Sequence, residues 1–252
     1  ALTMAQLAAS ACGAGPDQAL VMSTGIIGVF LPMDKITAGI RAAAARFGSP
    51  EAMFLAAARG LTTTDKSHKT AHRTLEAGGR TIRLAGMCKG AGMIGPRMAT
   101  MLAVVLTDAA LTVADSQASF VAAVEDSFNC ISVEGHMSTN DTLLLLASGA
   151  ARAQPLAGAD LAQFQQALRE VCIELAKQIP DDGEGATHLV TIDVQGTATR
   201  DDAFRIAKTV AESALVKTAI AGGDPNWGRI VSAAGYAGVP FDPGRVSLKV
   251  NG

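Results

Sequence analysis

The chain has 252 residues, of which 49% are hydrophobic and only 17% are charged, and its formal net charge is −2. This composition allows a sizeable core and excludes a disordered chain, and the lack of basic blocks argues against a nucleic-acid partner. No apolar run reaches the roughly 18 residues that a membrane span requires, so a membrane protein is excluded as well.

The cysteines and the N-terminal residues indicate the compartment. The first residues show no signal-peptide pattern, which predicts a cytoplasmic protein. The four cysteines are far apart in apolar surroundings, so we expect reduced, buried thiols and neither disulfides nor a metal site. These cysteines are Cys12, Cys88, Cys130 and Cys172.

The first quarter of the chain is predicted to form short helices and one strand. A helix is expected over residues 2–10, followed by a short buried strand over 19–22. Apolar residues at helical spacing then predict a helix that starts after Pro32 and ends at Gly48. The next helix is predicted to start after Ser49 as N-cap and to run to about residue 59.

The strand at 19–22 leads into Ser23-Thr24-Gly25. A hydroxyl followed by a glycine at the end of a strand can direct a side-chain O–H and a backbone N–H to one point. Two such donors form an oxyanion hole. The other interpretation of this segment is a tight turn from strand to loop.

The middle of the chain is predicted to be a hairpin followed by a glycine-rich loop. Residues 72–76 and 81–86 alternate between apolar and polar and are joined by Ala77-Gly78-Gly79, which is typical of a β-hairpin. A nearly uncharged glycine-rich loop over 89–99 then leads into an apolar run at 101–107, which we expect to be a buried strand.

This loop also fits the dinucleotide-binding pattern G-x-G-x-x-G at residues 90–95, with Asp108 near the distance of a ribose-binding acid. That fingerprint requires a helix directly after the glycines. Here Pro96 and a predicted strand follow, so we reject a dinucleotide site.

A different chemistry is possible where the loop meets the strand, at Ala99-Thr100. The Thr100 hydroxyl can attack the carbonyl of Ala99, which shifts the acyl group from nitrogen to oxygen and leaves an ester for water to cleave. Thr100 would then be an N-terminal residue whose α-amine, with a pKa of roughly 8, can serve as a base for its own hydroxyl.

The second half of the chain mixes helices and strands without strict alternation. The expected helices cover residues 115–129 (capped by Asp115 or Ser116), a segment after the caps at 138–141 that includes the leucines up to 146, 159–179 and 200–215. The expected strands cover residues 130–133, 189–194 and 245–250. This order predicts an α+β fold, a layered αββα-type sandwich of mixed sheets flanked by helices, and not a Rossmann fold.

Several blocks of the sequence resemble the ornithine acetyltransferase (glutamate N-acetyltransferase) family, in the same order and over nearly the whole chain. The most specific block is Lys-Gly-x-Gly-Met-Ile-x-Pro-x-Met-Ala-Thr-Met-Leu at residues 89–102. The other blocks are Ser-Thr-Gly at 23–25, Thr-Thr-Asp at 63–65 with a lysine at 69, Ser-Thr-Asn-Asp at 138–141, Asp-Gly-Glu-Gly-Ala-Thr at 182–187, and the turn-rich segment 223–230.

The resemblance implies a self-cleaving enzyme that transfers an acetyl group from N-acetylornithine to glutamate. It places cleavage between Ala99 and Thr100, the nucleophile on Thr100 and the oxyanion hole on Thr24 and Gly25. Substrate contacts fall on Thr63, Lys89, Thr100 and Glu184. Residues 1–99 would form an α chain and residues 100–252 a β chain of one intertwined catalytic domain, assembled as α2β2 without a cofactor or a metal ion.

Departures from the family pattern leave alternatives open. They occur at residues 66–68, Arg97, 134–137 and His188, and family members extend further at both ends, including a C-terminal tail that contacts substrate. The chain therefore resembles either an arginine-pathway enzyme or a specialised-metabolism paralogue, with acetyl-CoA as an open second donor. An N-terminal-threonine amidohydrolase or aminopeptidase is the alternative activity, and an uncleaved binding protein is the non-catalytic one.

Overall fold

The centre of the fold is a mixed four-stranded sheet, seen in a computed structural model that describes residues 1–95, 101–151 and 154–251. Strands β1 (Lys69–Ala77) and β2 (Arg80–Lys89) form the predicted hairpin around a two-residue turn. Strand β3 (Leu102–Thr107) pairs antiparallel with β2, and β4 (Thr142–Ala147) pairs parallel with β3. The order across the sheet is therefore β1-β2-β3-β4.

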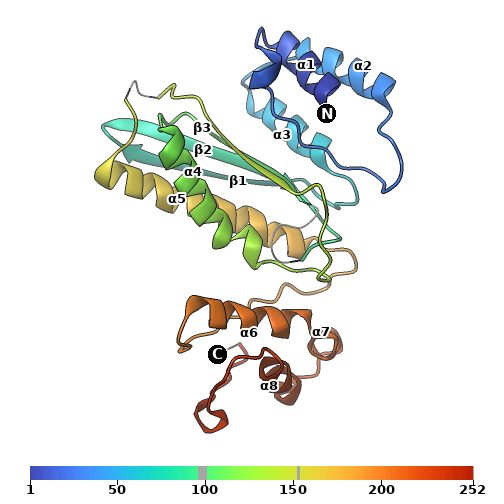
Figure 1. Cartoon of the computed structure of the whole chain (residues 1–252), viewed down its shortest axis with the longest axis vertical. Coiled ribbons are helices and arrows are strands. Elements are labelled where there is room, and N and C mark those ends of the chain that lie inside the picture. The colour runs from blue at the N-terminus through green and yellow to red at the C-terminus, as the bar shows by residue number, and fades with distance from the viewer. Residues whose placement is uncertain (96–100, 152–153, 252) are drawn as a thin grey trace.

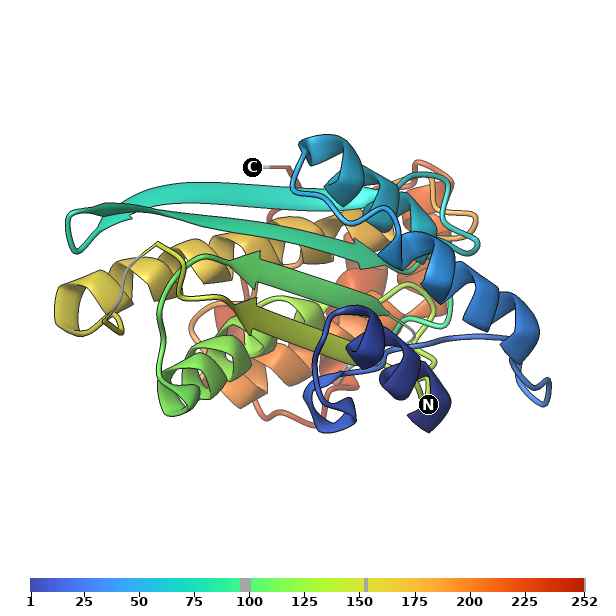
Figure 2. The same ribbon diagram turned by 90° about the horizontal axis from the view of Figure 1, so that it is seen from above.

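Two helices, α4 (Val113–Glu125) and α5 (Gly158–Asp181), cover one face of this sheet (Figures 1 and 2). The 24-residue α5 crosses β1 and β2 and buries a continuous apolar stripe against them. Each large side chain in that stripe contributes about 1.5–3 kcal/mol of hydrophobic stabilisation. The buried residues of α5 are Phe164, Ala167, Leu168, Val171, Cys172, Leu175, Ala176 and Ile179.

Three helices precede the sheet: α1 (Leu2–Ala11), α2 (Met33–Ala44) and α3 (Glu51–Leu61). Helix α1 packs on α2, and α3 packs against β2. This part of the chain has little core of its own, because Ala9 and Ala58 are its buried hydrophobic side chains among the described residues. The three helices lie together near one end of the sheet (Figure 2).

The C-terminal part forms a separate small helical core below the sheet and α5 (Figure 1). Helices α6 (Arg200–Glu212), α7 (Ala214–Ala221) and α8 (Trp227–Gly235) pack around Val210, Val216 and Ala233. A single helix was predicted over 200–215, but Ser213 divides it, because its hydroxyl accepts a hydrogen bond from the Val216 N–H and caps α7. No helix in the described ranges is long and apolar enough to cross a bilayer.

Four segments predicted as strands are not strands in the structure. Residues 19–22, 130–133, 189–194 and 245–250 have no ladder partner within the described part of the chain. Near 130–133 the backbone amides are used differently, because the N–H groups of Val133 and Gly135 donate to the carbonyl of Ile94 at 2.9 and 3.1 Å. A β-rich residue pattern therefore produced extended or turning backbone without sheet pairing.

The leucine run at 142–146 was predicted to be helical and is instead strand β4. Its length of six residues is typical of a strand, and pairing with β3 satisfies its backbone groups. The cysteine prediction is correct for Cys88 and Cys172, which are buried, and wrong for Cys12 and Cys130, which are exposed beside helical ends. Burial raises the pKa of the Cys172 thiol to about 12, so it stays protonated at neutral pH.

The predicted fold class is confirmed: the chain is a mixed α+β structure and not a Rossmann fold. Within the described residues, the next element after the glycines at 90–95 is strand β3, as expected, and not the helix that a dinucleotide fingerprint needs. The described residues contribute one sheet, with its helical layer on the face occupied by α4 and α5.

Candidate active site

The glycine-rich loop after β2 brings the Glu184 segment to the end of the sheet. The Glu184 N–H donates to the carbonyl of Ala91 at 2.8 Å. A Cβ on Gly92 would lie 2.8 Å from Cδ of Glu184, so the carboxylate lies directly against the glycine. Further along, the backbone of Gly95 contacts Gly135 so closely that a Cβ would approach its carbonyl to 2.6 Å. Glycines here allow backbone and carboxylate to approach each other closely.

Lys89 is the last residue of β2 and is 3% exposed. Burial lowers the pKa of its ammonium group, while the nearby charges of Asp65 and Asp141 act in the opposite direction. A buried lysine at the start of an otherwise uncharged loop can attract a substrate carboxylate. The structure therefore places Lys89 at the same loop as Glu184.

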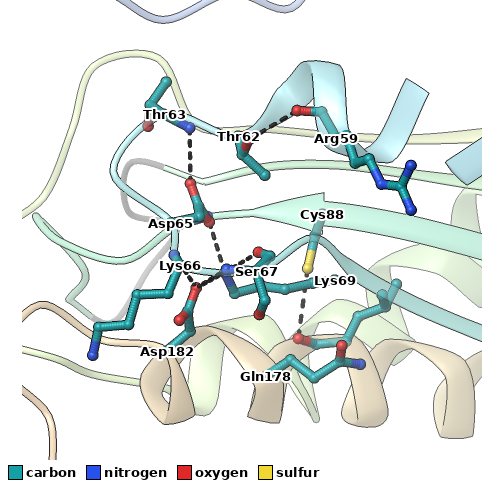
Figure 3. A network of polar contacts seen from close by, with 12 residues as sticks. Arg59, Thr62, Thr63, Asp65, Lys66, Ser67, Lys69, Cys88, Gln178 and Asp182 are labelled. Carbon is teal, nitrogen blue, oxygen red and sulfur yellow. Dashed lines mark hydrogen bonds and ion pairs between the residues drawn. The ribbon is translucent and has the colours of Figure 1, made fainter. Parts of the chain in front are cut away.

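Thr63 lies in the loop between α3 and β1 and is fixed by Asp65 (Figure 3). Its N–H donates to Oδ2 of Asp65 at 3.0 Å, and Oδ1 of the same carboxylate accepts the Gly90 N–H at 2.7 Å. Burial by itself would raise the pKa of Asp65, but the hydrogen bonds from Lys69, Gly90 and Thr63 lower it below its ordinary value. One ionised carboxylate thus joins the Thr63 loop to the residue after Lys89.

Thr24 and Gly25 are joined to the start of β3 through Asn140 and Asp141. The Asn140 side chain donates to the carbonyl of Ser23 at 2.9 Å, and the next residue, Asp141, accepts the Met101 N–H at 3.0 Å. The strand expected before Thr24 does not form, and Thr24 is half-buried while Gly25 is exposed. The segment is therefore held by a side chain and not by a sheet.

Ala99 and Thr100, the predicted cleavage residues, lie outside the described residues, as does Arg97. The described structure continues at Met101, which is 1% exposed and whose N–H is bound by Asp141. Burial raises the pKa of Asp141, against the opposing effects of the Met101 N–H and Lys89. The partly desolvated Asp141 carboxylate therefore binds the backbone N–H of Met101, the residue that follows the predicted nucleophile.

The structure thus connects Thr63, Lys89 and Glu184 at residues 89–92 of one loop, whereas Thr24–Gly25 is linked through Asn140 and Asp141 to the start of β3. Asp65, Asn140 and Asp141, which make these connections, were not among the predicted site residues. All three occur in blocks that resemble the family, but an Asp or Asn in such a block is locally indistinguishable from a turn or helix cap. No three His, Cys, Asp or Glu side chains within the described residues are arranged to hold a metal ion.

Comparison with known proteins identifies the family. The model of the ArgJ family matches residues 1–252. The chain belongs to the ArgJ family. The "Arginine biosynthesis bifunctional protein ArgJ" of Rhodopirellula baltica is 49% identical over 255 residues, and that of Symbiobacterium thermophilum is 50% identical over 251 residues. These alignments cover 100% and 98% of the chain and 62% of each relative, so the chain spans less than two thirds of the curated ArgJ proteins that it matches.

A solved ArgJ structure supports the same conclusion. The crystal structure of the arginine biosynthesis bifunctional protein from Bacillus halodurans superposes with a TM-score of 0.54 at 44% sequence identity. The match covers 55% of this chain and 66% of that one. The family resemblance seen in the sequence blocks is therefore confirmed by both sequence and fold.

Proposed function

We propose that this ArgJ-family protein is a glutamate N-acetyltransferase, which moves an acetyl group from N2-acetyl-L-ornithine to L-glutamate. The observation that carries the proposal is the convergence of Thr63, Lys89 and Glu184 on the loop that precedes residues 99–100. Asp65 links the first two segments, and the Glu184 N–H binds Ala91 in that loop. Curated relatives are named for arginine biosynthesis, which favours this pathway over a specialised-metabolism role.

The first step we propose is self-cleavage. The Thr100 hydroxyl attacks the Ala99 carbonyl, the C–N bond between the two residues breaks, and the acyl group is carried as an ester on Thr100. Water hydrolyses that ester, leaving Ala99 with a carboxylate and Thr100 with a free α-amine. Because an α-amine has a pKa of roughly 8, a substantial fraction is neutral near physiological pH and can act as a base.

The second step is acetyl transfer by a ping-pong route. The Thr100 hydroxyl, losing its proton to the α-amine, attacks the acetyl carbonyl of N-acetylornithine. The amide C–N bond breaks, ornithine leaves with the proton, and an acetyl-threonine ester remains. The amine of glutamate then attacks this ester, which forms N-acetylglutamate and restores the hydroxyl. Thr24 O–H and Gly25 N–H would hold the oxyanion in both halves, an effect worth several kcal/mol per pair of donors.

Three residues would orient the amino acid. The Lys89 ammonium suits a substrate carboxylate, the exposed Glu184 carboxylate suits its amino group, and Thr63 supplies a hydroxyl. Holding the donor in one orientation can account for several kcal/mol of the barrier reduction. The two chains produced by cleavage would assemble as α2β2, and this route requires neither a cofactor nor a metal ion.

Intact-mass analysis of the purified full-length protein tests the cleavage. We expect two chains, with threonine as the first residue of the second, and a single uncut chain for Thr100→Ala. The control Thr3→Ala, at an exposed position of α1, should be cut like the wild type. An uncut wild type, or a Thr100→Ala variant that is still cut at this bond, would contradict the mechanism.

Kinetics then separate the transferase from the alternative amidohydrolase. A transferase releases ornithine faster when glutamate is added and gives parallel double-reciprocal lines. An N-terminal-threonine amidohydrolase releases acetate and ornithine at a rate that does not depend on glutamate. Supplying acetyl-CoA in place of N-acetylornithine shows in the same assay whether the second donor is accepted.

A further inference from the structure

The feature that the proposed mechanism leaves unused is a buried lysine between two aspartates (Figure 3). Lys69, the first residue of β1, is 1% exposed. Its Nζ lies 2.7 Å from Oδ1 of Asp65 and 2.6 Å from Oδ2 of Asp182, and it donates more weakly to the Ser67 carbonyl at 3.4 Å. Three acceptors thus meet the three N–H bonds of one ammonium group. We call Asp65, Lys69 and Asp182 the buried triad.

The two carboxylates of the triad also bind backbone N–H groups from separate segments. Asp65 accepts the N–H groups of Thr63 and Gly90. Asp182 accepts those of Lys66 and Ser67 at 2.9 and 3.3 Å through the same Oδ2 atom that meets Lys69. The triad therefore ties together the loop before β1, the end of β2 and the end of α5.

These three segments are the ones that carry the proposed substrate contacts. Thr63 is bonded to Asp65 directly, Lys89 immediately precedes Gly90, and Glu184 lies two residues after Asp182. The side chains of Asp65 and Asp182 are 0% and 10% exposed. The triad thus lies behind the loops, and its carboxylates bind backbone N–H groups of the segments that carry the site.

Stability alone is a poor explanation for this arrangement. Desolvating a lysine and two carboxylates is costly, and well-packed apolar side chains of the same volume usually stabilise a fold as well or better. Apolar side chains cannot hold four backbone N–H groups, three from the loop before β1 and one from the residue after β2, at defined distances. Charged hydrogen bonds can do so, since they are short and directional.

We propose that Lys69 is a positioning residue for the acetyl transfer, which through Asp65 and Asp182 holds Thr63, Lys89 and Glu184 at fixed mutual distances. This inference rests on the proposed function for its substrate and on the described contacts for its geometry. Lys69 touches no substrate. Its effect is on substrate binding, because small displacements of orienting groups are costly in a pre-organised site.

The decisive variant is Asp182→Asn in the full-length protein. Asparagine keeps an acceptor for Lys66, Ser67 and Lys69 but removes the charge from one side of the triad. We expect the KM for N-acetylornithine to rise at least tenfold with a smaller change in kcat. Hydrogen–deuterium exchange should become faster at 62–68 and 89–95, although both segments are distant from residue 182 in the sequence.

The matched control is Leu168→Ala, which truncates a fully buried side chain on the same helix away from the triad. Compared at a temperature where both variants are folded, it should leave KM within twofold of the wild type and the exchange of the two loops unchanged. Equal KM values and equal exchange in Asp182→Asn and Leu168→Ala would overturn the proposal.

A neutral triad separates positioning from folding. In the triple variant Asp65→Asn/Lys69→Met/Asp182→Asn no buried charge is left uncompensated, so stability should largely return, but no group joins the two amide side chains. We expect KM to stay high. A KM that recovers together with the melting temperature would show that the triad acts only on stability.

The exchange experiment also distinguishes failure of this inference from failure of the proposed function. If the wild type transfers no acetyl group while Asp182→Asn still loosens 62–68 and 89–95, the proposed reaction is wrong and the coupling of the loops stands. If transfer is observed and the loops are unaffected by Asp182→Asn, the reaction stands and the positioning role is wrong.

Discussion

The carboxylate of Glu184 rests on the Cα of Gly92, with no room for a side chain between them. A Cβ at Gly92 would lie 2.8 Å from Cδ and 2.9 and 3.0 Å from the two oxygens of Glu184. Real Cβ atoms do not come so close to a carboxylate, so any larger residue at position 92 has to move Glu184. The glycine loop therefore sets where this acid lies relative to Lys89.

Gly92→Ala is expected to weaken substrate binding more than stability. The displaced Glu184 would no longer meet the substrate amino group, so we expect the KM for N-acetylornithine to rise about tenfold, which corresponds to roughly 1.4 kcal/mol. Steady-state kinetics measure this. The control Gly39→Ala, at an open position inside α2, should leave KM unchanged and stabilise the helix by about 0.5–1 kcal/mol. A Gly92→Ala enzyme with the wild-type KM would contradict the contact.

Gly86→Ala tests the packing of α5 on the sheet. The new methyl group would lie 2.6 Å from Leu175 and 3.2 Å from Val171, so the fully packed interface must shift. Overpacking of this kind costs about 1–3 kcal/mol, which urea unfolding can measure. Adding Leu175→Ala removes the clash, so the double variant should lose less stability than the sum of the two single variants. Strict additivity would show that the two residues are not in contact.

Asp65→Asn should reduce stability in a pH-dependent way. The pKa of Asp65 is lowered in the fold, so its ionised form stabilises the native state above its ordinary pKa of 3.8, and this contribution is lost as the pH falls through the lowered folded value. We expect the variant to be about 1–3 kcal/mol less stable than the wild type at pH 7. The difference should shrink at pH 3 and below, as measured by urea unfolding across this range.

Asp141→Asn should show the opposite pH dependence. The pKa of Asp141 is raised by burial, so the stability it provides is complete below its ordinary pKa of 3.8 and is lost as the pH rises through the raised folded value. Asparagine can still accept the Met101 N–H without carrying the charge. The variant should therefore gain roughly 1 kcal/mol relative to the wild type at pH 7 and nothing at pH 3. A loss of stability that grows with pH would contradict this.

The sequence was most informative where local pattern and final environment agree. The hairpin of β1 and β2 has alternating residues and a Gly78-Gly79 turn, and α5 has an apolar stripe long enough to establish its helical period. The hairpin could be predicted because its two strands are adjacent in the chain, and α5 because it packs on one broad face of the sheet. The end points differed only by a few residues.

The failures have a common physical origin in pairing over long sequence distances. The leucines at 142–146 resemble a capped helix locally. They form a strand because β4 pairs in parallel with β3, whose residues lie 40 positions earlier in the sequence. Residues 189–194 have strand-like composition but find no ladder partner in the described structure. Composition indicates the tendency of a segment to be extended, whereas a strand also requires a neighbour.

The candidate site shows the same division. The family blocks included Asp65, Lys69 and Asp182 beside Thr63, Lys89 and Glu184, but they did not indicate that these residues bind one another. Lys69 and Asp182 are 113 residues apart, so no local motif could reveal their ion pair. Asn140 and Asp141 were predicted to be caps because residues of these types often bind nearby backbone groups. In the structure they bind distant backbone groups, the Ser23 carbonyl and the Met101 N–H.

The position of β3 has a consequence for the fate of a cut molecule. This strand follows the proposed scission point, yet six of its residues are laddered to β2, which precedes it, and six to β4, which follows it. Helix α5, from the later piece, is packed on the hairpin of the earlier one. The two polypeptides would therefore stay associated after cleavage of the peptide bond. They should migrate as one complex in native gels and separate only in denaturant.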